Sequence, residues 1–389
     1  PNIWQVGITQ KQATNLFSES SGVPALNRPL QGMYAPASTF KSISAVAAIN
    51  AGYNMNSSYK CPSKVLIGNR EFANFETKSQ GTINMKRAIA VSCDTIWYQI
   101  AYDEWVRDGG LFPKSGLNDY FFTAARGFGL GKITGIDLPS EASGRLPDRA
   151  WKEAVYKENK DFYCNFKTRA KKSDLTPFLI EVARENCLDG NIVRAGDAVN
   201  FSIGQGDTLM TPIQMAQVYA AIANGGTMYK PQVARAIIKS NGQVVKEFQP
   251  EVIATQTLSK KATKFLHEAL RAVTTEGTAA GAFSGFPVAI SGKTGTAEDK
   301  GRNKDGSAKA DTAWFASFAP ADNPKYAVVM VVSQGGFGSS ISAVGARDIY
   351  AALYGVSGGK VDPAKEIFPN GVPTKLPKVD PKNAKLVKP

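Results

Sequence analysis

Apolar residues recur with helical spacing in two segments of the first hundred residues. Residues 35–52 are filled with small and apolar side chains, and Gly52 can end a helix there. Within residues 81–102 the apolar spacing is interrupted at residues 92–94. We expect one helix in the first segment, with Ser38 in its first turn, and two helices in the second segment, joined by a short loop.

Later segments change from helix to strand. The sequence TPIQ at residues 211–214 is a capping box with Pro at the first helical position, which predicts a helix after it. Residues 288–296, 312–319 and 326–333 are β-rich and are separated by turn-forming residues, which predicts an antiparallel meander. A further helix is expected at about 343–354.

Two segments look peripheral to the core. Residues 151–196 are charged, have weak periodicity and contain two cysteines, which is typical of an insertion on a domain surface. Residues 359–389 are rich in Lys and Pro and poor in aromatic residues, which predicts a flexible, disordered tail. The chain has 389 residues, 43% of them hydrophobic, which is enough for a large core. We assign residues 1–358 to one domain that contains the insertion.

The net charge of +13 does not identify a partner. The Lys and Arg residues are scattered without zinc-finger spacing or an RNA-recognition signature, which argues against nucleic-acid binding. A solvated basic surface and attraction to an anionic envelope surface both fit. No apolar run approaches the roughly 18 residues needed to cross a bilayer. Because the chain begins at Pro1 rather than Met, a signal or anchor removed upstream is compatible with the sequence.

Cysteine and histidine content argues against a metal site. Cys61, Cys93, Cys164 and Cys187 form no CxxC pair, and His267 is the one histidine in the sequence. Zinc is therefore not expected. Buried free thiols are the default expectation for all four cysteines. Alternatively, Cys164 and Cys187, which flank the polar insertion, can form a disulfide in an oxidising compartment.

Ser38 and Lys41 place a hydroxyl and an amine three residues apart. On a helix this spacing puts both side chains on one face. A lysine whose pKa is lowered by burial and by neighbouring cations can take the proton of a serine hydroxyl, which makes Ser38 a candidate nucleophile and Lys41 a candidate base. The S-x-x-K pattern alone is weak, because a solvent-facing pair has the same spacing.

Two further elements strengthen this interpretation. The sequence KTGT at residues 293–296 ends a predicted strand, where Gly295 would let a substrate backbone pair along the strand. Lys293 would supply positive charge, and the hydroxyls of Thr294 and Thr296 would hold a terminal carboxylate.

The second element is the loop Ser92-Cys93-Asp94. The Ser92 hydroxyl could relay a proton to a leaving amine, and the Asp94 carboxylate could orient Lys41 or Lys293 by charge-assisted hydrogen bonds.

The three elements occur in the order S-x-x-K, S-x-[ND] and K-T-G. Together they resemble the motif set of penicillin-binding proteins and class A β-lactamases, with Asp94 in place of the usual Asn. The strings YAPASTFK, FGLGKITGIDLPSEASGRLPD, SIGQGDTLMTPIQMAQVYAAIANGG and SGKTGTAE are similar to class B penicillin-binding proteins, and the resemblance covers about residues 1–355. Asp94 and the Cys-containing insertion are most similar to the penicillin-binding protein 2 subgroup, which acts in cell elongation.

This resemblance implies an α/β fold of the penicillin-binding and serine β-lactamase-like type, in which a five-stranded antiparallel sheet is flanked by helices beside an all-helical region. Ser38 would attack the penultimate D-alanine carbonyl of a peptidoglycan stem peptide, with Lys41 as base and Ser92 as proton relay. The backbone N–H groups of Ser38 and Thr296 would form the oxyanion hole. No metal or cofactor is implied.

Asp94 is a departure from the family pattern. An ionised carboxylate only accepts hydrogen bonds, whereas an amide also donates them. With Lys293, Asp94 would form the electrostatic frame of the site. Its charge is expected to raise the pKa of Lys41 and make that amine a less available base, unless burial offsets the effect.

The resemblance also implies partners and a location. The partners would be stem peptides ending in D-Ala-D-Ala, β-lactam antibiotics and, in a full-length protein, a RodA-type glycan polymerase. The catalytic domain would lie on the outer face of the cell membrane, anchored by an N-terminal segment.

Two other functions fit part of the pattern. A serine β-lactamase shares the STFK sequence, but the E-x-x-L-N string that class A enzymes use to activate water is missing. A sensor or scaffold that binds a β-lactam or peptidoglycan without turnover would carry the same residues.

Overall fold

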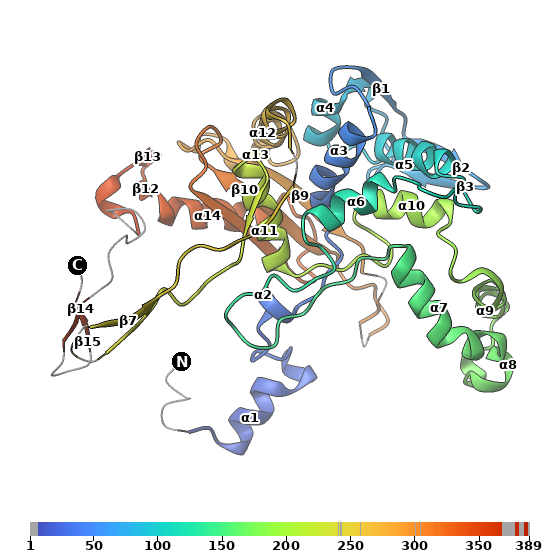
Figure 1. Cartoon of the computed structure of the whole chain (residues 1–389), viewed down its shortest axis with the longest axis horizontal. Helices are drawn as coiled ribbons and strands as arrows, with labels where there is room; N and C mark the ends of the chain where they lie inside the picture. The colour runs from blue at the N-terminus through green and yellow to red at the C-terminus, as the bar shows by residue number, and fades with distance from the viewer. Residues whose placement is uncertain are drawn as a thin grey trace.

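The computed structural model describes residues 7–389 except 240, 242, 257, 300, 304, 368–377, 381–384, 388 and 389. Its centre is an antiparallel sheet with the strand order β11, β10, β9 (Figure 1). β9 Ser291–Ala297, β10 Thr312–Ala319 and β11 Tyr326–Val332 follow one another along the chain, which confirms the predicted meander. The implied count of five strands is not confirmed, because three strands pair in this sheet within the described residues.

The remaining elements are helices, short turns and two-stranded ribbons. The helices are α1 Gln10–Phe17, α2 Arg28–Gln31, α3 Lys41–Asn50, α4 Met85–Ala90, α5 Thr95–Arg107, α6 Tyr120–Gly127, α7 Arg149–Cys164, α8 Phe166–Arg169, α9 Pro177–Asp189, α10 Ala195–Ser202, α11 Pro212–Ala223, α12 Lys260–Thr275, α13 Ala280–Phe283 and α14 Ser342–Leu353. The 3-10 turns are η2 Glu19–Ser21, η3 Ala37–Phe40, η4 Lys172–Asp174 and η5 Pro363–Lys365. The ribbons pair β1 Ser58–Cys61 with β4 Gly81–Asn84, β2 Lys64–Ile67 with β3 Arg70–Ala73, β5 Thr227–Tyr229 with β8 Val252–Thr255, β6 Ala236–Ile238 with β7 Val244–Glu247, β12 Val356–Ser357 with β13 Lys360–Val361, and β14 Lys378–Asp380 with β15 Lys385–Val387.

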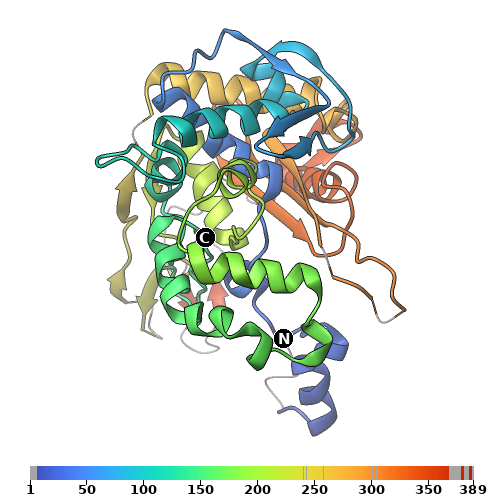
Figure 2. The ribbon, with the colours of Figure 1, turned by 90° about the vertical axis from the view of Figure 1, so that its right-hand side faces the viewer.

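Helices cover both faces of the central sheet (Figures 1 and 2). On one face lies α14, which confirms the helix predicted at about 343–354, and its Tyr350 hydroxyl is 3.0 Å from the Ser317 hydroxyl of β10. On the opposite face lies α12, where the His267 ring packs 4.8 Å from the Phe318 ring, with α11 beside it. Burial on both faces explains why β10 is a continuous run of buried residues.

Side-chain caps set where several helices begin. Thr211 and Gln214 form the predicted capping box, which confirms the helix that follows as α11. The expectation of helix from residue 81 is wrong, because residues 81–84 form strand β4. The Asn84 side chain then accepts a hydrogen bond from the Arg87 N–H at 2.8 Å and starts α4.

A mainly helical region lies beside the sheet, formed by α3, α4, α5, α6 and α10 (Figure 1). It is not all-helical as the resemblance implies, because the ribbons β1/β4 and β2/β3 pack against α4 and α5. Three aromatic rings from different parts of the chain join it. Phe201 of α10 packs 4.9 Å from Phe40 of η3 and 4.5 Å from Phe122 of α6. These residues belong to one hydrophobic cluster that is continuous with the face of the sheet, so η3 is fixed where the two regions meet.

The segment predicted to be an insertion, at about 151–196, forms a helical hairpin of α7, α8 and α9 (Figure 2). Within these three helices Ala183 is the one fully buried residue, so the hairpin adds little to the core. A disulfide between Cys164 and Cys187 joins the end of α7 to α9. This confirms the proposed pairing.

The default expectation of free thiols is wrong for all four cysteines. In addition to the disulfide in the hairpin, Cys61 at the end of β1 is bonded to Cys93 in the loop between α4 and α5. Both residues are buried. The partners are 32 residues apart in the sequence and no local pattern links them, so the fold alone brings them together.

Part of the predicted tail has regular structure. Residues 359–367 include β13 and η5, and β14 pairs with β15 further on. Much of the remaining tail lies outside the described residues, so its flexibility and the domain boundary at residue 358 stay predictions. Each helix in the described part of the chain is too short or too polar to span a bilayer.

The Cys164–Cys187 disulfide gives a prediction about stability. Replacing both cysteines by alanine should lower the free energy of unfolding by about 3 kcal/mol, because the cross-link closes a loop of 23 residues and restricts the unfolded chain. Denaturant unfolding of the double variant would measure the loss. An unchanged midpoint, or two free thiols in the parent protein by non-reducing mass spectrometry, would contradict this account.

Candidate active site

Ser38 lies in η3, the 3-10 turn that leads directly into α3. The helix predicted over residues 35–52 is therefore present, but its first turn is tighter than an α-turn. Ala37 starts the turn with φ of +49°, and its N–H donates to the Gly204 carbonyl at 2.9 Å. The turn leaves Ser38 partly exposed, whereas Lys41 at the start of α3 is fully buried.

The Lys41 ammonium group is held by the loop between α4 and α5. Its Nζ donates to the Ser92 carbonyl at 2.7 Å, to the Ser92 hydroxyl at 3.1 Å and to Asp94 Oδ1 at 2.6 Å. The Asp94 side chain is 8% exposed, so the ion pair is screened from water. Of the two lysines that Asp94 was predicted to orient, it binds Lys41, whereas the Lys293 amine donates to the Thr294 carbonyl.

The expected contact between Ser38 and Lys41 is not formed as a hydrogen bond in the described part of the chain. All three donor positions of Lys41 point to Ser92 and Asp94 instead. A proton from Ser38 would therefore reach the neutral amine of Lys41 after a small movement of that side chain, or through the Ser92 hydroxyl, which lies beside Lys41 Nζ.

Ser92 itself adopts an unusual backbone conformation. Its φ is +59°, in the left-handed region that residues other than glycine rarely adopt. Such a conformation persists where surrounding contacts hold it. Here Lys41 Nζ donates hydrogen bonds to both the carbonyl and the hydroxyl of Ser92, and these contacts favour its left-handed backbone conformation.

Burial and charge act in opposite directions on Lys41. Removal from water lowers the pKa of the Lys41 amine and is the largest effect, whereas the charge of Asp94 and its hydrogen bond raise that pKa. The net result is a pKa below the ordinary value. Asp94 thus raises the pKa, as expected, but burial outweighs it, so the neutral, basic form of Lys41 becomes more accessible.

Lys293 is a second fully buried lysine, on strand β9. Its Nζ donates to the Thr294 carbonyl at 3.1 Å. Burial lowers its pKa well below the ordinary value, the nearby charge of Lys41 lowers it further, and Asp94 raises it. The coupling shows that the motif at 293–296 and the loop at 92–94 lie in one electrostatic environment.

The two threonines of the K-T-G-T sequence have different partners. The Thr294 hydroxyl is 2.6 Å from the Thr278 hydroxyl, in the segment after α12. The Thr296 hydroxyl accepts a hydrogen bond from the Gly338 N–H at 3.3 Å. Both hydroxyls are thus oriented by segments outside the sheet, on a strand that pairs with β10 on one side within the described residues.

Gly295 is required by close packing. A Cβ at this position would lie 3.0 Å from the Pro36 carbonyl oxygen and 3.1 Å from the Thr39 methyl group. The glycine therefore lets η3, which carries Ser38, approach β9. The sequence predicts that Gly295 lets a substrate backbone approach β9, and the structure adds a packing constraint within the protein itself.

Three residues that the sequence did not single out contribute to the site: Asn74, Thr278 and Gly338. Thr278 and Gly338 contact the threonines of β9, and the Asn74 side chain accepts hydrogen bonds from the loop that holds Lys41. The preference of asparagine for turns and caps is a weak signal for Asn74. No local pattern marks the other two, because their contacts are long-range.

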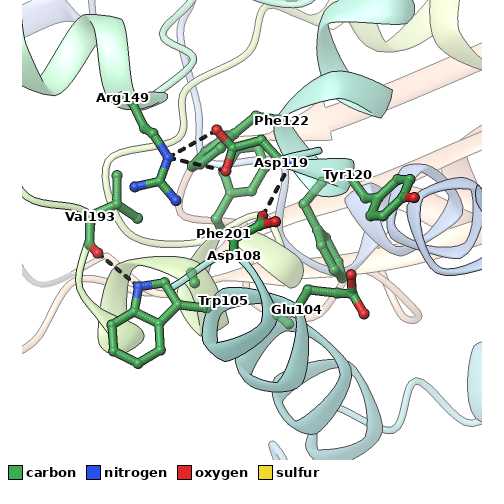
Figure 3. Close-up of a pocket in the computed structure, with 12 residues that line it drawn as sticks. Glu104, Trp105, Asp108, Asp119, Tyr120, Phe122, Arg149, Val193 and Phe201 are labelled. Atoms are coloured by element: carbon green, nitrogen blue, oxygen red, sulfur yellow. Dashed lines mark hydrogen bonds and ion pairs between the residues drawn. The ribbon is translucent and has the colours of Figure 1, made fainter. Parts of the chain in front are cut away.

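A separate hollow lies between α5, α6 and α7, where Trp105 and Phe122 form part of its wall (Figure 3). In it Arg149 pairs with Asp119 at 2.9 Å, and the Asp119 N–H donates to Asp108. Its volume of about 30 Å3 has room for one or two water molecules. In the described ranges no group of three or more His, Cys, Asp or Glu residues could hold a metal ion.

A partly exposed serine and a buried lysine held by three hydrogen bonds lie where a helix-covered antiparallel sheet meets a helical region, which is the arrangement of the penicillin-binding and serine β-lactamase-like fold. The particular family follows from the sequence as a whole. The chain belongs to the penicillin-binding protein transpeptidase domain family, whose model matches residues 5–351.

Curated relatives of the chain include proteins named peptidoglycan D,D-transpeptidase. The MrdA protein of Salmonella typhimurium is 28% identical over 369 residues, which cover 91% of this chain and 52% of that protein. The MrdA protein of Escherichia coli K12 is 27% identical over 357 residues, 88% of this chain and 49% of that protein. The chain thus spans about half the length of the curated relatives it matches.

Solved structures agree with this fold. Penicillin-binding protein 2 of Pseudomonas aeruginosa, in complex with WCK 5153, has a TM-score of 0.68 and 27% identity, covering 92% of this chain and 66% of that one. A chain from a peptidoglycan synthase complex that coordinates polymerization and crosslinking has a TM-score of 0.68 and 30% identity, covering 90% of this chain and 51% of that one.

The opposed effects on Lys41 predict the outcome of Asp94→Asn. The substitution removes the charge that raises the Lys41 pKa, so the acid limb of the pH dependence of acylation by a penicillin should move to lower pH. The acylation rate at its optimum should fall roughly 10²-fold, because an amide holds the amine less firmly. Stopped-flow acylation across a pH series would measure both.

Asp119→Asn is the matched control, since it removes a carboxylate that pairs with Arg149 and not with Lys41. It should leave the acid limb in place. A profile of Asp94→Asn that overlays that of the parent protein would remove Asp94 from the electrostatics of the site.

Proposed function

We propose that this protein is a peptidoglycan D,D-transpeptidase that cross-links stem peptides through a serine acyl-enzyme and acts in cell elongation and shape. The observation that supports this most strongly is the position of the buried Lys41. Its amine is hydrogen-bonded to Ser92 and Asp94, and Lys41 begins α3 directly after the turn η3 that contains Ser38. The names of the relatives from Salmonella typhimurium and Escherichia coli, peptidoglycan D,D-transpeptidase, also support the proposal.

In the acylation step Ser38 Oγ attacks the carbonyl carbon of the penultimate D-alanine. Lys41 takes the serine proton, and the oxygen that becomes negative is held by the N–H groups of Ser38 and Thr296. The C–N bond then breaks, and the Ser92 hydroxyl passes a proton from Lys41 to the leaving amine of the terminal D-alanine. The ester of Ser38 with the shortened stem remains.

In the second step an amine from a neighbouring stem attacks this ester. The amine loses a proton to Lys41 through Ser92, a new amide bond forms, and Ser38 regains its hydroxyl proton. The free Ser38 hydroxyl and the neutral Lys41 amine are regenerated, so the site returns to its starting state. A base with a depressed pKa suits both steps, because it must accept and return a proton near neutral pH.

Strand β9 is the proposed docking element for the stem peptide. Its edge away from β10 offers backbone groups to an extended peptide, as in recognition by strand addition. The Thr294 and Thr296 hydroxyls bind the terminal carboxylate, and Lys293 on the same strand supplies positive charge when its amine is protonated. Thr278 supports this role, since its contact fixes the direction of the Thr294 hydroxyl.

β-Lactam antibiotics and a glycan polymerase are the other proposed partners. A β-lactam presents a reactive carbonyl and a carboxylate to the same groups. A polymerase of the RodA type is supported by the similar chain from a peptidoglycan synthase complex. We further propose that the domain works on the outer face of the cell membrane, where an anchor outside this sequence would hold it and where disulfides are stable.

Acylation by a labelled penicillin tests this function. The adduct on Ser38 should persist for hours, because the drug-derived acyl group blocks the approach of an amine and no described residue is evidently placed to activate water. Intact-protein mass spectrometry would show one added drug mass, which is lost in Ser38→Ala and retained in the matched control Ser357→Ala.

The rival functions give different results in the same measurement. Rapid loss of the adduct with release of hydrolysed drug would identify a β-lactamase. Absence of any adduct would identify a non-catalytic binding protein.

A further inference from the structure

The loop that holds Lys41 is itself held from its far side. Asn74 lies between β3 and the segment that leads to β4, and its side chain is buried, with 8% of the residue exposed. Its Oδ1 accepts hydrogen bonds from the N–H groups of Asp94 at 2.8 Å and Thr95 at 3.1 Å. Asp94 is the residue before α5 and Thr95 is its first residue, so one side chain binds the start of that helix and fixes the end of the loop.

The same amide is anchored on its other side. Asn74 Nδ2 donates to the Pro62 carbonyl at 2.9 Å and to the Lys78 carbonyl at 2.8 Å. All of its strong donor and acceptor positions are therefore used in a buried environment. An amide with all of these hydrogen bonds is held in one orientation. The position of the loop at residues 92–94 therefore depends on the position of the segment between β1 and β4 that holds Asn74.

A covalent bond acts at the middle residue of the loop. Cys93 stands between Ser92 and Asp94, and its disulfide partner Cys61 ends strand β1. The Thr95 hydroxyl also donates to the carbonyl of Pro62, the residue after Cys61, at 2.9 Å. The loop is thus tied to the same segment by the disulfide, by Asn74 and by Thr95.

The orientation of the Asp94 carboxylate depends on this segment as well. Oδ1 of Asp94 accepts from Lys41, and Oδ2 accepts from the Phe75 N–H at 3.2 Å. Phe75 directly follows Asn74. The carboxylate therefore has one oxygen on the lysine and one on the segment that carries the asparagine.

We propose that Asn74 and the Cys61–Cys93 disulfide form a loop clamp that positions Ser92 and Asp94 against Lys41 for acylation. The clamp residues act through Asp94 and Ser92 and are positioning residues, because they do not contact the Lys41 amine. This inference rests on the proposed acyl-enzyme function and goes beyond it by assigning roles to residues outside the three motifs. A shift of about 1 Å in a reacting group can cost about 10²-fold in rate, so the clamp is expected to matter for the chemical step.

The two disulfides of the chain provide a matched experiment. The double variants Cys61→Ala/Cys93→Ala and Cys164→Ala/Cys187→Ala remove cross-links spanning 32 and 23 residues, so both should lose similar amounts of stability by the chain-entropy argument. Acylation by a chromogenic penicillin would be measured over a range of drug concentrations. This separates the limiting acylation rate from the dissociation constant of the non-covalent complex.

The clamp predicts a split between these two quantities. In Cys61→Ala/Cys93→Ala the limiting acylation rate should fall about tenfold or more, and the dissociation constant should stay the same, because the carboxylate-binding threonines are on β9. Cys164→Ala/Cys187→Ala should change neither. Equal limiting rates in both double variants would overturn the proposal.

A second pair of variants covers the case in which the first does not fold. Asn74→Asp keeps the acceptor for the Asp94 and Thr95 N–H groups but cannot donate to two carbonyls. Gln214→Glu is the same change at another buried amide, whose Nε2 donates to the Lys132 and Ser143 carbonyls. Only Asn74→Asp should lower the limiting acylation rate.

Failure of the inference is distinguishable from failure of the proposed function. A parent protein that forms no acyl-enzyme would refute the function and the clamp together. A parent protein that is acylated, with Asn74→Asp acylated at the same limiting rate, would refute the clamp alone. If neither the cysteine variant nor Asn74→Asp folds, the segment is a folding element and the positioning role is likewise overturned.

Discussion

The buried ion pair between Lys41 and Asp94 is the interaction on which the rest of the site depends. A lysine with no exposed surface is costly to keep charged, and its carboxylate partner Asp94 is 2.6 Å away. Removing one member of such a pair typically costs about 3–5 kcal/mol, because the other charge stays buried. The pair is therefore less a source of stability than a means of holding an amine whose pKa is lowered by burial next to Ser92.

Several features of the fold serve to bring this pair to the edge of the sheet. Gly295 allows η3 to lie close to β9, and the aromatic contacts of Phe40 fix η3 against the helical region. Lys293 contributes a second buried amine from the strand. Two lysine amines, Lys41 and Lys293, and the Asp94 carboxylate thus lie close together. Such clusters are common where proteins shift the pKa of a catalytic group.

Local patterns in the sequence predicted much of this site, and long-range contacts account for what they missed. The capping box at Thr211 and the meander depend on neighbouring residues, and both are confirmed. The S-x-x-K and S-x-[ND] motifs predicted that Ser92 and Asp94 lie beside Lys41. The pairing of Cys61 with Cys93 and the role of Asn74 could not be read from the chain, because each joins segments about 20 to 30 residues apart through folding. The strand at 81–84 was missed because a helix pattern follows it directly.

The central claim is that Lys41 is a buried amine with a lowered pKa, paired with Asp94. Direct titration of the lysine side chains by NMR, with 13C at the ε-position and the Lys41 signal assigned by its loss in Lys41→Arg, tests this without relying on activity. The account predicts that the Lys41 signal titrates clearly below about 10.4, the ordinary value, and moves lower still in Asp94→Asn. A Lys41 signal that titrates with the surface lysines, and is unaffected by Asp94→Asn, would contradict it.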